Sequence, residues 1–578
     1  MKAAPRTTLC VLLLPLAMLF SATQTSAQDR TQNRSMVISR SGVVAAESPL
    51  AAQAGATILA HGGNAIDAAI ATNAVMGVVE PMMNGIGGDL FAIVYDARTG
   101  KLYGLNASGW APGALTIDYL KAKNVMQMPA SGIDTVTVPG AVEGWNKLHQ
   151  RFGRVAWKDL FAPAIFYAEN GFAVPEIISM AWGEDREKLM KDPESRRVFL
   201  VHDKAPQLGE VFRNPDIAKA LRLLAAGGAQ AFYRDEIGKA ILATSRELGG
   251  TMTAQDLQDF SAEWVEPIST TYRGWKVYEL PPNGQGMAAL EMLNILEQFT
   301  PAKAGPLSAE ELHKRIEAMK LAYADLARYN ADPRFAKVPV AGLLSKEYAA
   351  QRAQRINPQK ANCDTDAGRP PASDTTYLTV VDREGNIVSL IQSNFSGFGS
   401  GITVRGMGFP LQNRGALFLL DPAKPDALAG HKRPFHTIIP AFMERGDDHI
   451  GFGIMGGANQ PLAHAQFVSN VVDYGMNLQA AMETARFTVR SNFNIGCKIL
   501  MEDRVPGEVR QQLTDMGHQL DLRGDFSLYM GRGQAIDHNT KTGMNFAASD
   551  ARTDGSAEPE FPPGLQLTGP RTKPQEKR

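Results

Sequence analysis

The sequence of 578 residues contains only three cysteines, Cys10, Cys363 and Cys497. So few thiols can neither stabilise a protein of this size by disulfide cross-links nor form a thiolate metal site. The 59 basic and 60 acidic side chains leave a formal net charge of −1. This balance lacks the excess of positive charge that is typical of proteins that bind nucleic acid or an anionic membrane. With 44% hydrophobic residues, the composition favours a globular protein with a large core. We therefore expect neither a nucleic-acid partner nor a membrane partner.

The longest apolar run lies at the N-terminus. Lys2 and Arg6 precede the run Leu9–Phe20, and small residues then lead to Ala27. This order is that of a cleaved secretory signal peptide, residues 1–27. A membrane anchor is the alternative, but a span requires about 20 apolar residues and this run has 12. The pattern predicts a periplasmic or secreted protein.

Export would place the two remaining thiols in a compartment that permits disulfides. Cys363 and Cys497 remain after removal of the signal peptide. The sequence is compatible with one bridge between them and equally with two free thiols.

Apolar periodicity divides the chain into a mainly helical part and a part rich in hairpins. Strands are expected at 90–95 and 101–105, and residues 138–351 are mainly helical. The clearest helices are expected at 48–60, 65–79, 141–152, 157–171, 215–225 and 309–329. The stretch 357–373 is rich in Pro and Gly and is typical of an exposed linker.

After this linker the pattern changes to strand pairs. Strands are expected at 375–382, 387–392, 438–444 and 449–454, with helices at 461–474 and 478–486. The Pro-rich, charged stretch 555–578 is typical of a disordered tail. Hairpins without regular βαβ alternation favour a layered α/β sandwich over a doubly wound sheet.

Few cofactor motifs are present. Gly451-x-Gly453-x-x-Gly456 matches the dinucleotide fingerprint, and Asp473 lies at the expected distance beyond it. The strand before it belongs to a hairpin, however, and no second βαβ unit follows, which disfavours a dinucleotide. The ten histidines lack metal-ligand spacing and no P-loop occurs. We expect neither a cofactor nor a metal.

The junction between linker and strand carries a further chemical possibility. Asp374 and Thr375 stand where the breaker-rich stretch meets a strand of buried type. If the chain is cut between them, Thr375 has a hydroxyl and a free α-amine, whose ordinary pKa is about 7.7–8.0. One residue then supplies nucleophile and base. The alternative is a threonine that simply starts a strand, as threonine often does.

Sequence segments along nearly the whole chain resemble one family. Thr375-Thr-x-x-Thr-Val-Val-Asp382 followed by Gly385-Asn386 is similar to the processing site of the γ-glutamyltranspeptidases, which are N-terminal-nucleophile hydrolases. Further similar segments are Gly62-Gly-Asn-Ala-Ile-Asp-Ala-Ala69, Pro81-x-x-Asn-Gly-Ile-Gly-Gly88, Gly399-Ser-Gly-Ile402, Lys432-Arg-Pro434, Gly456-Gly457 and Ala548-Ser-Asp-Ala-Arg552. The resemblance implies a proenzyme that cuts itself before Thr375.

The same resemblance implies an architecture and catalytic residues. The two autoprocessed subunits, a large subunit 28–374 and a small subunit 375–578, would form a four-layer αββα sandwich. Thr375 matches the family's nucleophile, and Gly456 and Gly457 match its oxyanion-hole glycines. Two backbone N–H groups ahead of a helix suit a developing negative charge.

The pocket positions keep some family residues and change others. Ser393 stands in place of a threonine that supports the nucleophile, Thr437 matches the second of two serines, and His436 replaces the first. Ser108 stands where the family has an arginine for the substrate α-carboxylate. The positions that bind the α-amino group are Phe395, Arg414 and Leu417.

These departures bear on the substrate. Ser cannot replace a bidentate arginine, and neither Phe395 nor Leu417 can accept a hydrogen bond from an ammonium group. Arg414 could bind a carboxylate from the opposite wall. The stretch 392–401 with 411–415, and the short segment between Phe418 and Lys432, look more like a divergent short-lid branch that includes cephalosporin-acylase-like members.

Three functions follow from this comparison. We expect an exported γ-glutamyl amide hydrolase or transferase, similar to a glutathione hydrolase, in which the short lid favours hydrolysis over transfer. The first alternative is a related acylase or amidohydrolase for glutaryl or oxamate-type amides. The second is a binding protein that keeps the fold without catalysis. The partners expected are small amide substrates and the two subunits of the same precursor.

Overall fold

The computed structural model describes residues 32–364, 374–489 and 496–562. The predicted signal peptide and the end of the predicted tail lie outside the described residues. Among the described residues, no helix combines the length and apolar character needed to cross a membrane.

Two antiparallel seven-stranded sheets form the centre of the molecule. The first has the order β19 (Ser556–Pro559), β2 (Val43–Ala46), β10 (Asp374–Val381), β11 (Ile387–Phe395), β3 (Asp89–Asp96), β4 (Lys101–Ala107) and β7 (Glu263–Val265). The second has the order β1 (Val37–Ser39), β18 (Met544–Ser549), β17 (Gly533–Asn539), β13 (Asp448–Ile454), β12 (Ala441–Arg445), β9 (Trp275–Glu279) and β8 (Ile268–Tyr272).

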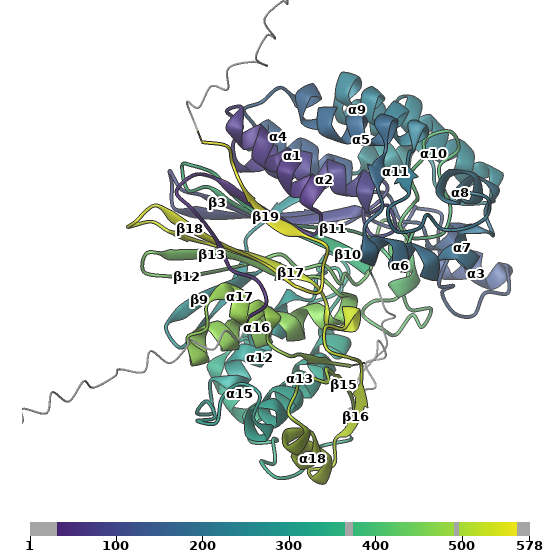
Figure 1. Cartoon of the computed structure of the whole chain (residues 1–578). Coiled ribbons are helices and arrows are strands. Elements are labelled where there is room, and N and C mark those ends of the chain that lie inside the picture. The colour runs from purple at the N-terminus through teal and green to yellow at the C-terminus, as the bar shows by residue number, and fades with distance from the viewer. Residues whose placement is uncertain (1–31, 365–373, 490–495, 563–578) are drawn as a thin grey trace, which may run out of the picture.

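A helical layer covers the outer face of each sheet (Figure 1). The first sheet is covered by α1 (Pro49–Ala60), α2 (Ala65–Val79), α4 (Ala141–Phe152), α5 (Ala162–Asn170) and α9 (Pro215–Tyr233). Around them pack α6 (Glu176–Glu184), α7 (Arg186–Leu189), α8 (Pro193–Phe199), α10 (Glu236–Glu247) and α11 (Ala254–Asp259). The second sheet is covered by α12 (Gly286–Leu296), α13 (Ala309–Tyr329), α15 (Lys346–Ala353), α16 (Gln460–Tyr474) and α17 (Leu478–Glu483).

Strand alternation produces three separate apolar layers, because successive side chains point to opposite faces. In β2, Val44 and Ala46 pack against the first helical layer, whereas Val43 and Ala45 pack between the two sheets. The same division holds along β3 and β10. The predicted four-layer αββα sandwich is therefore confirmed.

Local sequence explains where the buried helix α2 begins. Asn64 Oδ1 accepts hydrogen bonds from the N–H groups of Ile66 and Asp67, and the Asp67 carboxylate accepts one from Asn64 N–H. This capping box satisfies N–H groups that the first turn leaves unpaired. The Ala-rich helix is buried on all sides, as its composition predicts.

The region 138–351 is mainly helical, as predicted, but it also contains five short strands, namely β5 (Phe172–Ala173), β6 (Val211–Phe212), β7, β8 and β9. β7, β8 and β9 are three to five residues long and lie at or next to a sheet edge. Such short strands carry too little period-2 pattern to stand out between helices. Trp275-Lys-Val-Tyr-Glu279 does alternate between buried and more exposed side chains.

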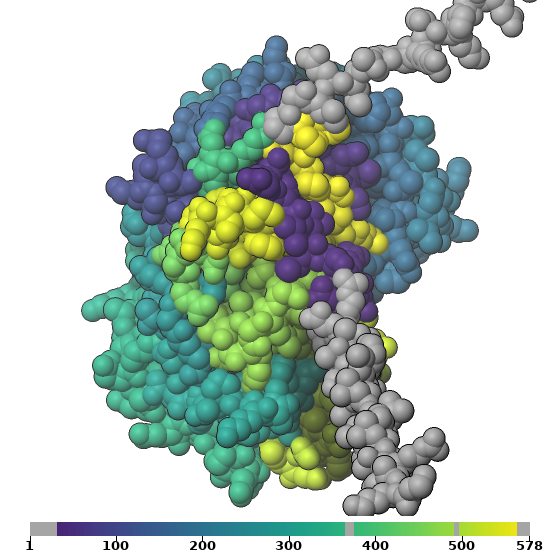
Figure 2. Space-filling view, turned by 60° about the vertical axis from the view of Figure 1, so that its left-hand side comes forward, coloured from purple at the N-terminus to yellow at the C-terminus, as the bar shows by residue number. Residues whose placement is uncertain are grey.

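The predicted tail was also wrong at its beginning. Residues 556–559 form β19, which pairs with β2, and the Glu560 carboxylate accepts a hydrogen bond from Gly42 N–H. An edge strand tolerates proline because one side of it needs no ladder hydrogen bond. Figure 2 shows the purple N-terminal segment and the yellow C-terminal segment side by side on the surface.

A small sheet lies beside the second helical layer. It consists of β14 (Phe487–Thr488), β15 (Lys498–Met501) and β16 (Gln519–Leu522), accompanied by α18 (Gly507–Asp515). The first half of the predicted linker reaches this sheet: Cys363 is disulfide-bonded to Cys497, and Ala361 is buried. Residues 357–364 are therefore anchored at Ala361 and Cys363, although most of them are exposed, as predicted for a linker, while 365–373 lie outside the described residues.

Candidate active site

The predicted nucleophile lies at an irregularity in the central sheet. Thr375 is the second residue of β10, and the register between β10 and β11 shifts between Asp374 and Thr376. Such a shift re-aims a side chain relative to a regular ladder. The Thr375 hydroxyl is buried and donates to Ser393 Oγ at 3.2 Å. Ser393 Oγ also accepts the N–H of Phe395 at 2.7 Å, so the neighbouring strand fixes the position of this hydroxyl pair.

Strand β13 crosses β10 on the facing sheet and leads to the two predicted oxyanion glycines. Gly451 faces Thr379, since a Cβ added there would lie 2.7 Å from Thr379 Oγ1, and Gly453 faces the ring of Tyr377. Residue numbers therefore increase along β13 in the direction in which they decrease along β10. The next step of two residues therefore brings Met455, which follows β13 and precedes Gly456, to the level of Thr375.

Glycine is required at this turn because both residues have positive φ. Gly456 has φ 133° and Gly457 has φ 61°, the region that favours glycine. Within the described parts of the chain, neither of their N–H groups donates to a protein acceptor. Gln285 Nε2 holds the turn by donating to the carbonyl oxygens of Gly457 and Thr437, at 2.8 and 2.5 Å. Two unused donors at such a turn suit an oxyanion.

Arg414 supplies a buried positive charge beside Thr437 and Phe395. It begins the 3₁₀ helix η3 (Arg414–Leu417), and its side chain is fully buried. Nη1 donates to Thr437 Oγ1 at 2.7 Å, and Cζ lies 4.4 Å from the centroid of the Phe395 ring. Nε and Nη2 are buried and, among the described residues, have no hydrogen-bond partner. Burial lowers the pKa of Arg414 to about 9, and unused guanidinium donors fit a carboxylate.

Asp89 and His436 form a buried pair beside Ser393. Asp89 lies on β3 directly opposite Ser393 of β11, and its Oδ2 is 3.0 Å from His436 Nε2. His436 Nδ1 accepts the N–H of Ile438, which places the imidazole proton on Nε2, where it is donated to Asp89. Burial raises the pKa of Asp89 to about 7 and lowers that of His436 well below its ordinary value.

Ser108 is tied into the wall of the site. Its hydroxyl accepts a hydrogen bond from Asn283 Nδ2 at 3.0 Å, and its carbonyl accepts one from Arg433 Nε at 3.1 Å. The Asn283 amide also donates to Pro434 O. Ser108 is fully buried, and its hydroxyl is already engaged by the hydrogen bond from Asn283.

The structure gathers the predicted residues into one network. Thr375 contacts Ser393, and Arg414 contacts Thr437. Gly457 is joined to Thr437 through Gln285. Sequence reasoning missed the residues that connect them, namely Asp89, Asn283, Gln285, Gln412 and Arg433. Of these, Asn283 and Gln285 belong to a turn cluster that the sequence identifies only by its Pro and Gly residues.

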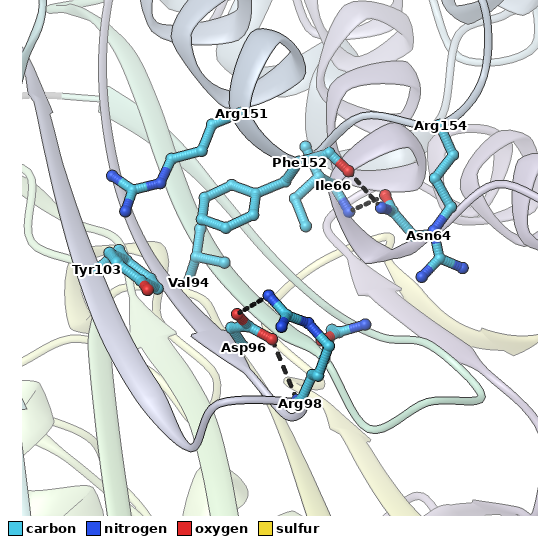
Figure 3. Close-up of a pocket in the computed structure, with 10 residues that line it drawn as sticks. Asn64, Ile66, Val94, Asp96, Arg98, Tyr103, Arg151, Phe152 and Arg154 are labelled. Carbon is cyan, nitrogen blue, oxygen red and sulfur yellow. Dashed lines mark hydrogen bonds and ion pairs between the residues drawn. The ribbon is translucent and has the colours of Figure 1, made fainter.

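A separate cavity lies far from Thr375. It has a volume of about 350 Å³ and is lined by Arg98, Arg151, Arg154, Tyr103, Asp96 and further residues (Figure 3). Asp96 ends β3 seven residues after Asp89, which corresponds to about 24 Å along a strand. This cavity is therefore at the opposite end of the sheet from the network around Thr375.

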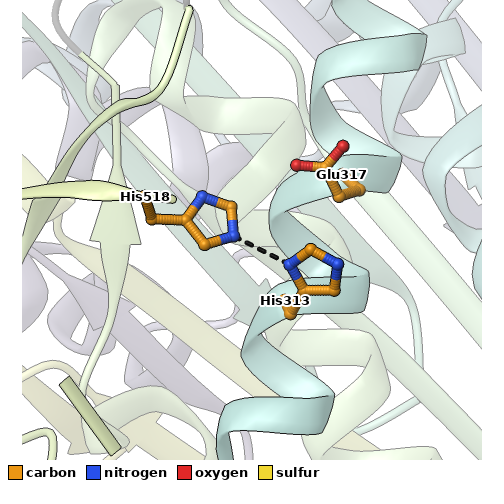
Figure 4. A group of neighbouring side chains, drawn as sticks. All are labelled: His313, Glu317 and His518. Carbon is orange, nitrogen blue, oxygen red and sulfur yellow. Dashed lines mark hydrogen bonds between the residues drawn. The ribbon is translucent and has the colours of Figure 1, made fainter. Parts of the chain in front are cut away.

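One buried cluster among the described residues has the composition of a metal site, namely His313, Glu317 and His518 (Figure 4). Lys320 Nζ donates to Glu317 Oε1 at 2.7 Å, so an ammonium group already occupies the place of a cation. The other Glu317 oxygen accepts Asn362 N–H. We assign no metal to this cluster.

The four-layer sandwich of two antiparallel sheets between helical layers defines the class of N-terminal-nucleophile hydrolases. The chain belongs to the γ-glutamyltranspeptidase family. The model of this family, described as Gamma-glutamyltranspeptidase, matches residues 51–560. This family contains hydrolases and acylases that are named as proenzymes.

Three similar proteins show the breadth of the family. The glutathione hydrolase-like YwrD proenzyme of Bacillus subtilis is 36% identical over 524 residues, 90% of this chain and 99% of that protein. The oxamate amidohydrolase proenzyme of Klebsiella pneumoniae is 33% identical over 530 residues, 90% of this chain and 98% of that protein. The structure of cephalosporin acylase from Bacillus halodurans has a TM-score of 0.86 at 41% identity and covers 93% of this chain and 99% of that chain.

Proposed function

We propose that the chain is an exported, self-cleaving amidohydrolase with Thr375 as its N-terminal nucleophile. Its substrates are γ-glutamyl amides of the glutathione type. The observation that carries this proposal is the buried Thr375 hydroxyl, held on Ser393 Oγ at the start of a central strand. The large subunit comprises residues 28–374 and the small subunit residues 375–578.

Maturation uses the same hydroxyl as turnover. Thr375 Oγ attacks the carbonyl carbon of Asp374, the C–N bond breaks, and the proton passes from Oγ to the released amine. Water then hydrolyses the resulting ester, which leaves a carboxylate on Asp374 and a free α-amine on Thr375. That amine has an ordinary pKa of about 7.7–8.0, so its neutral form is available as a base near pH 8.

During turnover the α-amine takes the proton of Thr375 Oγ while Oγ attacks the substrate amide carbonyl. The N–H groups of Gly456 and Gly457 stabilise the oxyanion. The ammonium returns the proton to the leaving amine, and an acyl ester on Thr375 remains. Water activated by the same amine hydrolyses this ester and regenerates the enzyme.

Arg414 provides the anchor for the acyl group. Its unused Nε and Nη2 donors are buried, and burying a guanidinium without a full set of partners is costly unless a ligand supplies them. A carboxylate on the acyl group fits this requirement. A γ-glutamyl group has such a carboxylate.

The segment that would form a lid favours hydrolysis. Between Phe418 and Lys432 the chain folds back on itself, with Leu419 N–H donating to Asp426 O and Leu428 N–H to Leu419 O. Phe418 and Leu428 pack in a small cluster with Ala111, Leu115 and Leu120, the last of which lies in α3 (Ile117–Ala122). A loop committed to this cluster leaves the acyl ester open to water.

A glutaryl or oxamate-type amide is the alternative substrate, because each also has a carboxylate on its acyl group. The names of two relatives, a cephalosporin acylase and an oxamate amidohydrolase, support this alternative. A binding protein without catalysis would have no need of an unpaired donor pair opposite the hydroxyl of Thr375.

Substitution of Thr375 tests the proposal. We expect the wild-type protein to yield two fragments that join at 374/375, and Thr375→Ala to remain one chain. Thr376→Ala is the matched control, because Thr376 is the next residue, is equally buried, and has a hydroxyl without a partner in the described structure. Intact-mass measurement that finds the same cut in Thr375→Ala would refute self-processing.

A further inference from the structure

The two cysteines of the described chain lie on opposite sides of the proposed cleavage point. Cys363 and Cys497 form a disulfide with their Cα atoms 4.8 Å apart, across a sequence separation of 134 residues. Asp374 is the eleventh residue after Cys363, so Cys363 belongs to the end of the large subunit and Cys497 to the small subunit. Cys497 is buried, whereas Cys363 is exposed.

The residues just before Cys363 make further contacts that fix them in place. Ala361 N–H donates to Met516 O at 2.8 Å. Asn362 N–H donates to the Glu317 carboxylate, and its carbonyl accepts from Lys320 Nζ at 2.8 Å. The end of the large subunit is therefore clamped between α13 and the small sheet, and the disulfide is the covalent part of this clamp.

The histidine pair in Figure 4 joins the same two parts of the chain. His313 lies on α13 and His518 immediately precedes β16, and His313 Nδ1 is 2.8 Å from His518 Nε2. Asn357 O accepts from His313 Nε2 at 2.7 Å, so His313 Nδ1 has no proton and accepts one from His518. The disulfide thus lies beside hydrogen bonds that also join residues before the cleavage point to residues after it.

We propose that the Cys363–Cys497 disulfide links the two subunits covalently after self-cleavage, so that the mature enzyme is one cross-linked heterodimer. This inference rests on the proposed cleavage at 374/375. Before the cut the disulfide only closes a loop within one chain. After the cut it makes reassociation of the subunits intramolecular, with an effective concentration independent of dilution. Export to an oxidising compartment would preserve it.

Denaturing gels with and without a thiol reductant test this linkage, and they separate it from the cleavage itself. We expect one band of full mature mass without reductant and two bands with it. Two bands under both conditions would overturn the linkage while leaving cleavage intact. One band under both conditions would overturn the cleavage and with it the linkage. Thr375→Ala, which we expect to give one band throughout, marks the position of the uncut chain on both gels.

A second measurement addresses the consequence for assembly. In the Cys363→Ser/Cys497→Ser double variant, we expect the urea midpoint of the cut enzyme to rise with each tenfold increase in protein concentration. The wild-type midpoint should not change with concentration. The double variant on the uncut Thr375→Ala background is the matched control and should also show no dependence. A concentration-dependent wild-type midpoint, or a concentration-independent midpoint in the cut double variant, would overturn the proposal.

Discussion

Arg414 lies over the ring of Phe395, and Phe395 is in turn the strand partner of Asp374. The buried guanidinium is therefore one aromatic side chain away from the proposed cleavage point. A substrate carboxylate held by Nε and Nη2 of Arg414 would place its acyl chain beside Thr375. From this relationship we expect substrate selection to depend on Arg414.

Removal of the guanidinium should impair carboxylate-bearing substrates selectively. We expect Arg414→Ala to lower kcat/KM for γ-glutamyl and glutaryl amides by roughly 1.5–3 kcal/mol of transition-state stabilisation, about 10- to 150-fold. A butyryl amide, which lacks the carboxylate, should lose much less and serves as the control substrate. If kcat/KM for the γ-glutamyl amide is unchanged, Arg414 is not the anchor.

The acyl group should need no α-amine. A site that hydrogen-bonds a substrate group rejects analogues without it, because its own buried polar atoms then lose their partners. Here Phe395 and Leu417 offer no acceptor, and the Ser108 hydroxyl is already engaged by Asn283. We expect kcat/KM for glutaryl amides to be within about tenfold of that for γ-glutamyl amides, a difference below about 1.4 kcal/mol. A thousandfold preference for γ-glutamyl would contradict this picture.

Substrate binding should depend on the ionisation of Asp89. Its pKa is raised to about 7, mainly by burial, and the charge of Arg414 opposes that rise. Below pH 7 Asp89 is neutral and the positive charge of Arg414 is uncompensated, whereas above pH 7 the Asp89 carboxylate offsets it. A substrate carboxylate therefore binds with uptake of a proton, and we expect KM to rise as the pH increases through about 7.

The matched variant for this effect is Asp89→Asn, in which KM should not vary between pH 6 and 8. The dependence of kcat provides an internal check, because the Thr375 α-amine must be neutral to act as a base and kcat should increase towards pH 8. A wild-type KM that is constant across this range would exclude the coupling between Asp89 and the carboxylate site.

Hydrolysis should dominate over transfer. The segment 418–432 packs against its own apolar cluster, so in the proposed mechanism it does not act as a cover over the acyl ester. We expect the hydrolysis product to exceed the transfer product even when a dipeptide acceptor is abundant. Product analysis by mass spectrometry decides this, and an excess of transfer product at modest acceptor concentration would count against it.

Much of the local structure is determined by the sequence alone. The predicted bounds of α2, α4 and α13 match the observed helices, and the hairpin of β10 and β11 was predicted with its turn. Helical periodicity, strand alternation and turn residues act over short distances along the chain, so they can be recognised without the fold. The motif at Thr375 and the glycine pair were likewise recognisable, although their catalytic roles stay predictions.

The tertiary structure decided which distant side chains meet. The contact between Asp89 and His436 spans 347 residues of sequence, and the pairing of Cys363 with Cys497 spans 134. The sequence left that pairing open, because a disulfide requires two thiols to be brought together by the rest of the fold. The charge state of Asp89 and the unused donors of Arg414 depend on the burial of both side chains. Burial is a property of the packed layers and not of any local pattern, which is why the sequence identified Arg414 as a candidate anchor but not the burial of its side chain or its neighbour Asp89.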